Sequence, residues 1–202
     1  MKKIILICIS FLFIASCETM SSIKKPDLSK PFSKCPPKEE RTLKDILCRE
    51  WFFMSFEEKI KELNIKLPNA ADPVGSYLAT RQAGKLLFIS GQISIDENGD
   101  LIKGKLGKDL STDEGYDAAK RCALSIISQT KKYLLDDLTK VKSCVKITGY
   151  VNSTDDFTEQ PKVINGASEI IVKIFGDIGM HARAAVSTNS LPLGVAVEVD
   201  AI

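Results

Sequence analysis

The feature that most constrains the fold is a change of hydrophobic period along residues 77–202. Residues 111–135 carry apolar side chains at the i, i+3, i+4, i+7 spacing of an amphipathic helix, and residues 161–176 repeat that spacing. Between them, residues 141–152 alternate apolar and polar side chains, which is typical of a half-buried strand. This mixture of periods predicts an α+β domain built around one core.

Five further segments are rich in β-forming residues and lie between turn signals. Asn98-Gly99 indicates a hairpin of type I′, whose two central residues both need positive φ. Ser111 and Glu114 form a capping box before the first long helix, and Pro161 suits the first turn of the second. The expected order is βββαβαββ, one sheet with both helices on one face. The expected strands cover residues 77–81, 85–95, 101–105, 141–152, 182–188 and 195–202. The helical residues expected in the core are Ala119, Cys122, Ala123, Ile126, Ile127, Thr130, Val163, Ala167, Ile170, Ile171 and Ile174.

The N-terminus has the pattern of an export signal. Met1-Lys2-Lys3 is basic, and residues 4–15 form an apolar run shorter than the roughly 20 residues of a membrane-spanning helix. The run ends in Ile14-Ala15-Ser16-Cys17, which resembles the lipobox of bacterial lipoproteins. We therefore expect a signal peptide over 1–17, lipidation of Cys17, and a chain anchored at the membrane surface facing the periplasm.

A linker and a second possible translation start, Met54, follow this signal. Residues 18–53 hold four of the eight prolines among Ser and Lys, which predicts an extended linker in which Cys35 and Cys48 could pair. From Met54 onward the chain is predicted as one domain over 54–202. Residues 1–53 could therefore also be a mispredicted upstream extension, and a protein that starts at Met54 would be cytoplasmic.

Charge and histidine content narrow the classes of function. Residues 1–53 contain 10 basic and 6 acidic side chains, and residues 54–202 contain 18 basic and 20 acidic ones. The globular part is mildly acidic, so we expect no nucleic-acid partner. His181 is the single histidine, and there is no CxxC motif, so we expect no metal site and no Ser–His–Asp triad.

Several motifs together resemble the YjgF/Rid family, also called reactive intermediate deaminases or endoribonuclease L-PSP. They are Leu87-Phe88-Ile89-Ser90-Gly91-Gln92-Ile93, residues 146–152 (KITGYVN), and the C-terminal stretches 181–183, 191–192 and 197–202. Residues 160–168 (QPKVINGAS) resemble a longer bacterial subgroup. The resemblance implies a chorismate mutase-like fold with a mixed sheet, and a homotrimer whose sites lie between subunits.

The resemblance also implies roles for six residues. Arg183 would grip a substrate carboxylate, which a planar guanidinium can bind bidentately. Glu198 would orient a water molecule. The resemblance places a ligand near Tyr77, Ser90, Gly91 and Asn165, and it implies no cofactor. Because side chains alternate along a strand, Arg183 should point to one face of the sheet, and Ala182, Ala184 and Val186 to the other. These three apolar residues are expected to pack into the core.

Two positions depart from the family pattern near this arginine. Ala185 stands where members with deaminase activity have Cys, and His181 stands where they have Pro. We expect His181 to be a loop residue at the rim of the pocket rather than a base.

The resulting functional hypothesis is hydrolysis of 2-imino acids or their enamines to 2-oxo acids. In this reading Arg183 fixes the carboxylate and Glu198 orients the attacking water. Small 2-imino or 2-oxo acids and other copies of the chain are the expected partners. The alternative is a trimer that binds small carboxylates and catalyses nothing. Ribonuclease activity is a weaker alternative because of the acidic balance and the single histidine.

Overall fold

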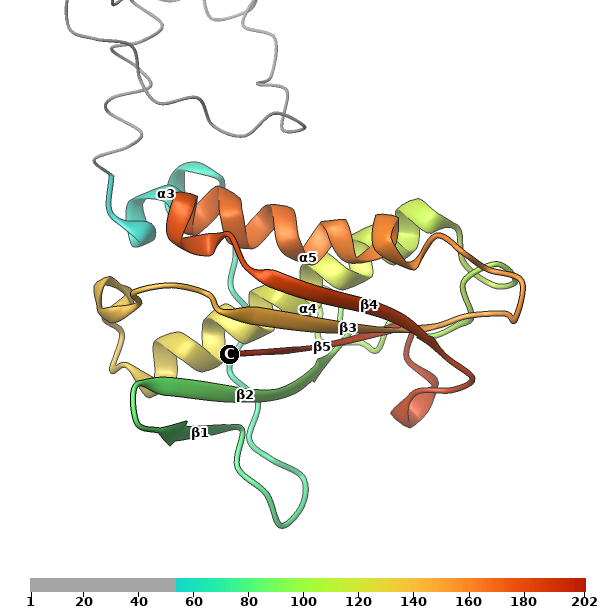
Figure 1. Ribbon diagram of the computed structural model, residues 1–202, viewed down its shortest axis with the longest axis horizontal. Coiled ribbons are helices and arrows are strands. Elements are labelled where there is room, and N and C mark those ends of the chain that lie inside the picture. The colour runs from blue at the N-terminus through green and yellow to red at the C-terminus, as the bar shows by residue number, and fades with distance from the viewer. Residues whose placement is uncertain (1–53) are drawn as a thin grey trace, which may run out of the picture. The chain divides into compact units, whose positions relative to one another are not determined.

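A five-stranded mixed sheet carries the fold in residues 54–202, the part of the chain that the computed structural model describes (Figure 1). The strands lie in the order β1-β2-β5-β3-β4, and only the edge pair β3–β4 is parallel. Their bounds are β1 Thr80–Ala83, β2 Leu86–Ile93, β3 Lys146–Asn152, β4 Ala182–Thr188 and β5 Val197–Ala201. The predicted signal peptide and linker, with Cys17, Cys35 and Cys48, lie outside the described residues.

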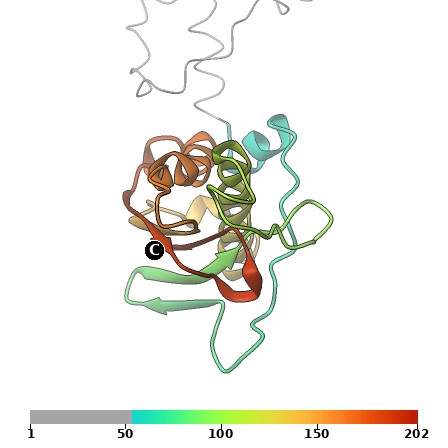
Figure 2. The same cartoon turned by 90° about the vertical axis from the view of Figure 1, so that its right-hand side faces the viewer.

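Two long helices, α4 (Thr112–Tyr133) and α5 (Gln160–Phe175), cover one face of this sheet (Figures 1 and 2). The capping box that Ser111 forms with Glu114 starts α4 as predicted, and a proline lies in the first turn of α5. The two helices approach closely at Gly166, where an added Cβ would lie only 2.0 Å from the Tyr116 carbonyl oxygen. All helical residues predicted for the core are buried except Thr130, which is half-buried.

Short elements complete the described chain. A third helix, α3 (Phe56–Glu62), begins at the capping box of Ser55 and Glu58. It packs the ring of Phe56 against that of Phe175 in a tilted arrangement, with ring centroids 4.9 Å apart. Three 3₁₀ turns are η3 (Leu138–Lys140), η4 (Gly176–Gly179) and η5 (Pro192–Gly194). Within residues 54–202, no helix combines the length and apolarity needed to cross a bilayer.

The predicted α+β class is confirmed, but the third predicted strand is wrong. Residues 101–105 form only isolated bridges, from Leu101 to Ile95 and from Lys103 to Val195. Gly104 has a φ of 131°, which turns the chain away before a ladder can form. The turn before it is also not type I′, because only Gly99 has a positive φ there, while the Asp96 carboxylate accepts hydrogen bonds from the following backbone amides.

Strand boundaries differ from the prediction at three places. The first strand begins at Thr80, so Tyr77 lies in the loop before it. The strand predicted from residue 141 begins at Lys146, and the strand predicted from residue 195 begins at Val197. Before the last two of these strands the apolar pattern starts earlier than the backbone pairing, because Val141 packs against the core and Val195 is buried.

Candidate functional site

Arg183 lies on the edge strand β4, on the side of the sheet that the helices cover. Its register partner on β3 is Ile147, which is fully buried among the helices. The guanidinium Nη1 donates to Asn165 Oδ1 at 2.8 Å and to Ser168 Oγ at 3.0 Å. Both acceptors lie on α5, one turn apart, so one helix face fixes the arginine. Two of the predicted site residues, Arg183 and Asn165, are therefore in direct contact.

The predicted facing of β4 is inverted. Ala182, Ala184 and Val186 do alternate with Arg183, but they lie on the face of the sheet without helices, and 44% of Val186 is exposed. Ala185, on the same side as Arg183, packs against the core. Alternation fixes which residues share a face but not which face the helices cover. A long arginine on an edge strand can share the core side because its head group reaches past the packed layer.

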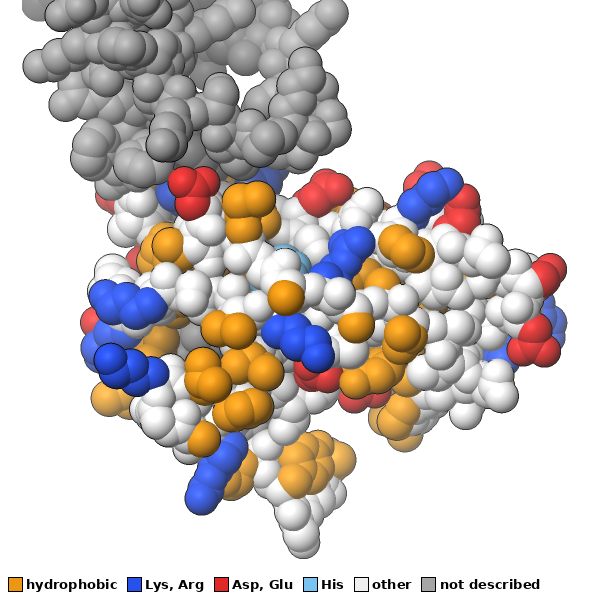
Figure 3. Space-filling view, in the orientation of Figure 1, with side chains coloured by type: hydrophobic (Ala, Val, Ile, Leu, Met, Phe, Trp, Pro, Cys, Tyr) orange, Lys and Arg blue, Asp and Glu red, His pale blue; other side chains and the backbone are white. Residues whose placement is uncertain are grey.

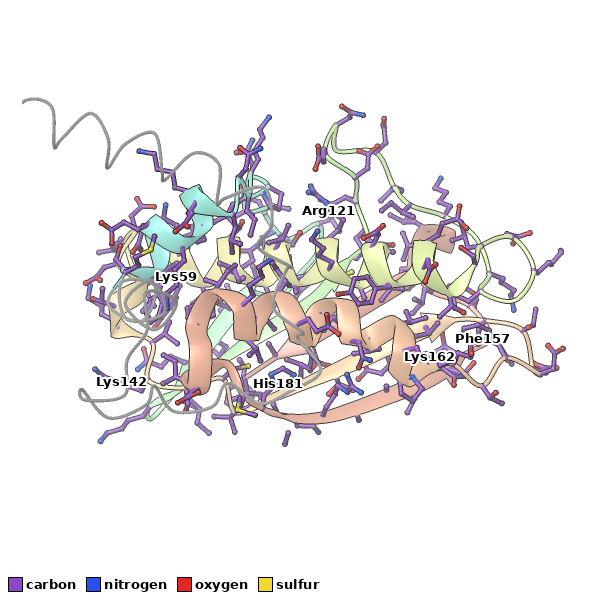
Figure 4. The ribbon with its side chains drawn as sticks, turned by 90° about the horizontal axis from the view of Figure 1, so that it is seen from above. Lys59, Arg121, Lys142, Phe157, Lys162 and His181 are labelled. Atoms are coloured by element: carbon purple, nitrogen blue, oxygen red, sulfur yellow. The ribbon has the colours of Figure 1, made fainter. Side chains whose placement is uncertain are left out.

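His181 precedes β4 and lies between that strand and α5 (Figure 4). Its Nδ1 is 2.7 Å from the Gly179 carbonyl oxygen, and its Nε2 is 3.1 Å from Ser168 Oγ. Burial lowers the pKa of the imidazole and outweighs the hydrogen bond to Gly179, which raises it; the nearby Arg183 charge lowers the pKa a little further. The histidine is thus neutral and joined to the arginine through one serine hydroxyl.

Glu198 lies on the opposite, open face of the sheet. It pairs in register with Tyr150 on β3 and with Ile93 on β2, beside a bulge of β2. Gly91 occupies this bulge, and a Cβ there would lie 1.9 Å from Glu198 Oε1. The Glu198 carboxylate therefore rests against the bare backbone of Gly91, and any larger residue there would displace it.

Acidic neighbours and burial shape the electrostatics of this open face. Tyr150 donates its hydroxyl proton to Asp200 Oδ2 at 3.2 Å. Burial raises the pKa of Glu198, and the Asp200 carboxylate raises it further. Burial and Asp200 likewise raise the pKa of Tyr150. A carboxyl group with a raised pKa is better able to accept or return a proton near neutral pH.

Ser90 and Tyr77 are less well placed to contact a ligand than the family resemblance implied. The Ser90 hydroxyl donates to the Leu78 carbonyl at 2.7 Å, and its amide donates to Ala79. Tyr77 is 53% exposed in the loop before β1. A pocket of about 420 Å³ nevertheless opens beside Ser90 and Gly91, and its lining also includes Leu78, Arg81, Phe88 and Asp200.

The predicted residues therefore form two half-sites. Arg183, with Asn165, belongs to the helix side of the sheet edge, whereas Glu198, Gly91 and Ser90 belong to the open face. Sequence reasoning did not single out Ser168, which touches both Arg183 and His181. The sequence feature that could have identified Ser168 is its spacing: it follows Asn165 by three residues on a helix, so both side chains lie on the same helix face.

The larger pocket lies elsewhere. It has a volume of about 510 Å³, is mostly apolar, and opens between the sheet and α4 beside Leu87, Ile127 and Cys144. It contains none of the predicted site residues. In the described part of the chain, no group of three or more His, Cys, Asp or Glu side chains is placed to hold a metal ion.

A mixed sheet with its long helices on one face and an arginine held at its edge defines an α+β protein of the chorismate mutase-like class. Residues 57–200 match the family described as "YjgF/chorismate mutase-like, putative endoribonuclease". The chain belongs to the YjgF family.

Relatives extend over the same region. Protein TCP17 of Trypanosoma cruzi is 45% identical over 144 residues, which cover 71% of this chain and 89% of that protein. A RutC family protein of Pyrococcus horikoshii is 33% identical over 135 residues, covering 66% and 90%. A crystal structure of a "putative endoribonuclease" from Shewanella oneidensis superimposes with a TM-score of 0.70 at 29% identity, covering 73% of this chain and 97% of that one.

Proposed function

We propose that the protein hydrolyses small 2-imino acids to 2-oxo acids and ammonia. The observation that carries this proposal is the fixation of Arg183 by Asn165 and Ser168, which presents a guanidinium in one orientation at the sheet edge. Within residues 54–202, Nε and Nη2 of this arginine have no hydrogen-bond partner, so two donors are free for a carboxylate. YjgF family membership supports the same substrate class.

The proposed reaction needs one water and one proton carrier. Water adds to the imine carbon, ammonia leaves with a proton, and a carbonyl group forms. A carboxylate placed over the C=N bond would orient the water and take its proton, and the raised pKa of Glu198 suits this role. Holding the substrate beside such a group lowers the entropic part of the barrier.

We further propose that the site is completed by a second copy of the chain, in a homotrimer. Arg183 and Glu198 of one chain face opposite sides of one sheet, so they cannot grip the same small acid. The open face supports an assembly, because it exposes Phe88 (41%) and Val186 (44%). Hydrophobic side chains also gather over the sheet in the space-filling view (Figure 3). Packing that face on another copy would bring one subunit's Glu198 towards a neighbour's edge arginine.

The test is the decay of 2-iminopropanoate, generated in situ by an amino-acid oxidase, with and without the purified full chain. We expect faster decay with protein, and a loss of the effect on the order of 100-fold in Arg183→Ala, because the carboxylate anchor disappears. Lys162→Ala is the matched control, since it removes an exposed cation from α5, the helix that holds the Arg183 side chain. Equal decay with and without the wild-type protein would contradict the proposal.

A binding protein without catalysis is the second candidate. The observation that favours it is Ala185, which packs against the core where deaminase members carry Cys. Calorimetry with pyruvate separates the two functions. Binding that depends on Arg183 without any acceleration of imine decay would establish the binding protein instead.

A further inference from the structure

Ser168 has the surroundings of an activated nucleophile. Its Oγ lies 3.1 Å from His181 Nε2 and 3.0 Å from Arg183 Nη1. A serine hydroxyl becomes a nucleophile when a base accepts its proton and a third group orients that base. The serine hydroxyl, a candidate nucleophile, therefore lies within hydrogen-bond distance of both a candidate base and a cation.

The hydrogen-bond pattern fixes the tautomer of the base. The Gly179 carbonyl can only accept, so Nδ1 of His181 carries the proton at that 2.7 Å contact. Burial and Arg183 keep the imidazole neutral by lowering its pKa. Nε2 therefore offers a lone pair, and the Ser168 hydroxyl donates to it. A backbone carbonyl thus plays the orienting part that a carboxylate plays in a catalytic triad.

Arg183 supplies positive charge where negative charge would develop. Its Nη1 hydrogen bonds to Ser168 Oγ and Asn165 Oδ1 leave Nε and Nη2 without partners within residues 54–202. Those free donors lie on the guanidinium that already contacts the serine oxygen. They are suited to hold the oxyanion that forms when a carbonyl carbon is attacked.

We propose that Ser168 is the nucleophile of a second activity, hydrolysis of short-chain carboxylic esters through an acyl-serine. Oγ attacks the carbonyl carbon while its proton passes to His181 Nε2, and the alcohol leaves with that proton. Water then attacks the acyl-serine and gives a proton to His181; the C–Oγ bond breaks, His181 returns that proton to Ser168 Oγ, and the acid is released. This activity shares Arg183 with the proposed imine hydrolysis but does not use Glu198.

A fluorophosphonate probe tests the nucleophile in the full chain. Attack forms an Oγ–P bond and expels fluoride, so intact mass shows one adduct and peptide mapping identifies its position. We expect the adduct on Ser168 and hydrolysis of 4-nitrophenyl acetate by the same protein. Ser168→Ala should abolish both signals, whereas Ser190→Ala, in an exposed loop serine, should leave both unchanged.

His181→Gln separates a catalytic from a structural role. Glutamine can keep a hydrogen bond to Ser168 but cannot act as a base, so labelling should slow by about 10²–10⁴-fold. The wild-type labelling rate should also fall as pH is lowered through the histidine pKa, and this dependence should vanish in the variant. A wild-type protein without an adduct on Ser168 at pH 8, or equal labelling of His181→Gln, would overturn the proposal.

Glu198→Gln distinguishes this activity from imine hydrolysis. It should stop acceleration of imine decay and leave labelling of Ser168 intact, because the two side chains lie on opposite faces of the sheet. Loss of labelling in Glu198→Gln, with folding retained, would contradict the independent ester-hydrolysis site.

Discussion

Arg183 and Glu198 project from opposite faces of the same sheet. The register makes this explicit, because Arg183 pairs with Ile147 of β3 and Glu198 pairs with Tyr150, three residues further along that strand. Residues three apart on a strand point to opposite sides. In the proposed homotrimer, a reaction that needs both side chains would therefore take them from different subunits.

Subunit complementation tests this consequence. Arg183→Ala and Glu198→Gln should each be inactive alone in imine decay, whereas co-expressed variants should recover activity. In randomly mixed trimers about a quarter of the sites would combine an intact arginine with an intact glutamate. Mixing the separately purified variants without subunit exchange is the control. Verified mixed oligomers without recovery would show that one subunit supplies both groups.

The pKa of Glu198 predicts a pH-dependent stability change. Burial and Asp200 raise this pKa above its usual 4.5, so the ionised side chain destabilises the folded state. This destabilisation is fully present above the pKa that Glu198 has in the folded protein, and it disappears as the pH falls towards 4.5. Glu198→Gln should therefore raise the Tm at pH 8, and the difference should vanish below pH 4.5. Thermal unfolding followed by circular dichroism measures it, and a constant difference across this range would contradict the assignment.

His181 predicts a change in a different pH window. Its folded pKa is lower than its usual 6.5, because burial and Arg183 disfavour the charged form. Above pH 6.5 the histidine is neutral in both states and has no effect. As pH falls from 6.5 through the folded pKa, the unfolded chain binds the proton more tightly and stability is lost. The Tm of the wild type should fall more steeply than that of His181→Gln between pH 7 and 5; parallel curves would refute this.

Alanine substitutions at Gly91 and Gly166 make a matched comparison, because an added Cβ would meet a side-chain atom at the first and a backbone atom at the second. Gly91→Ala would place a Cβ 1.9 Å from Glu198 Oε1, the movable end of a side chain. We expect it to displace the carboxylate and reduce imine hydrolysis with little change in Tm. Gly166→Ala would meet the Tyr116 carbonyl at 2.0 Å, where backbone must move, and should destabilise by about 1–3 kcal/mol.

A double variant makes the Gly91 prediction sharper. In a Glu198→Ala background the atoms that Gly91→Ala would strike are gone, so any stability cost of Gly91→Ala should disappear. Chemical denaturation of the four proteins gives the coupling energy between the two positions. A cost that persists without Glu198 would mean that the backbone of the bulge, rather than the carboxylate, requires glycine.

The sequence predicts the helices and their buried faces because their apolar spacing reports packing directly. Cys122, Ile126 and Ile170 are buried as their periods require. Pairing is harder to predict, because it depends on partners far along the chain. Residues 101–105 had a strand-like pattern, yet Gly104 at φ 131° bends them away and leaves two isolated bridges.

The candidate site was predictable only in part, for a similar reason. The resemblance identified Arg183 and Asn165, which are in contact. It could not reveal that β4 turns its arginine towards α5, since an edge strand can present either face to the helices. Ser168 was not predicted, because a serine in a helix is not distinctive by itself; only the fold shows that His181 and Arg183 contact it.

The position of β5 has a consequence for how the protein is made. This strand is central, between β2 and β3, yet it follows every other described element in the sequence. Until residues 197–201 have left the ribosome, the β1–β2 hairpin and the β3–β4 pair cannot join into one sheet. A nascent chain arrested before Val197 should therefore expose two unpaired strand edges to chaperones, and Glu198 reaches its place only when the sheet closes.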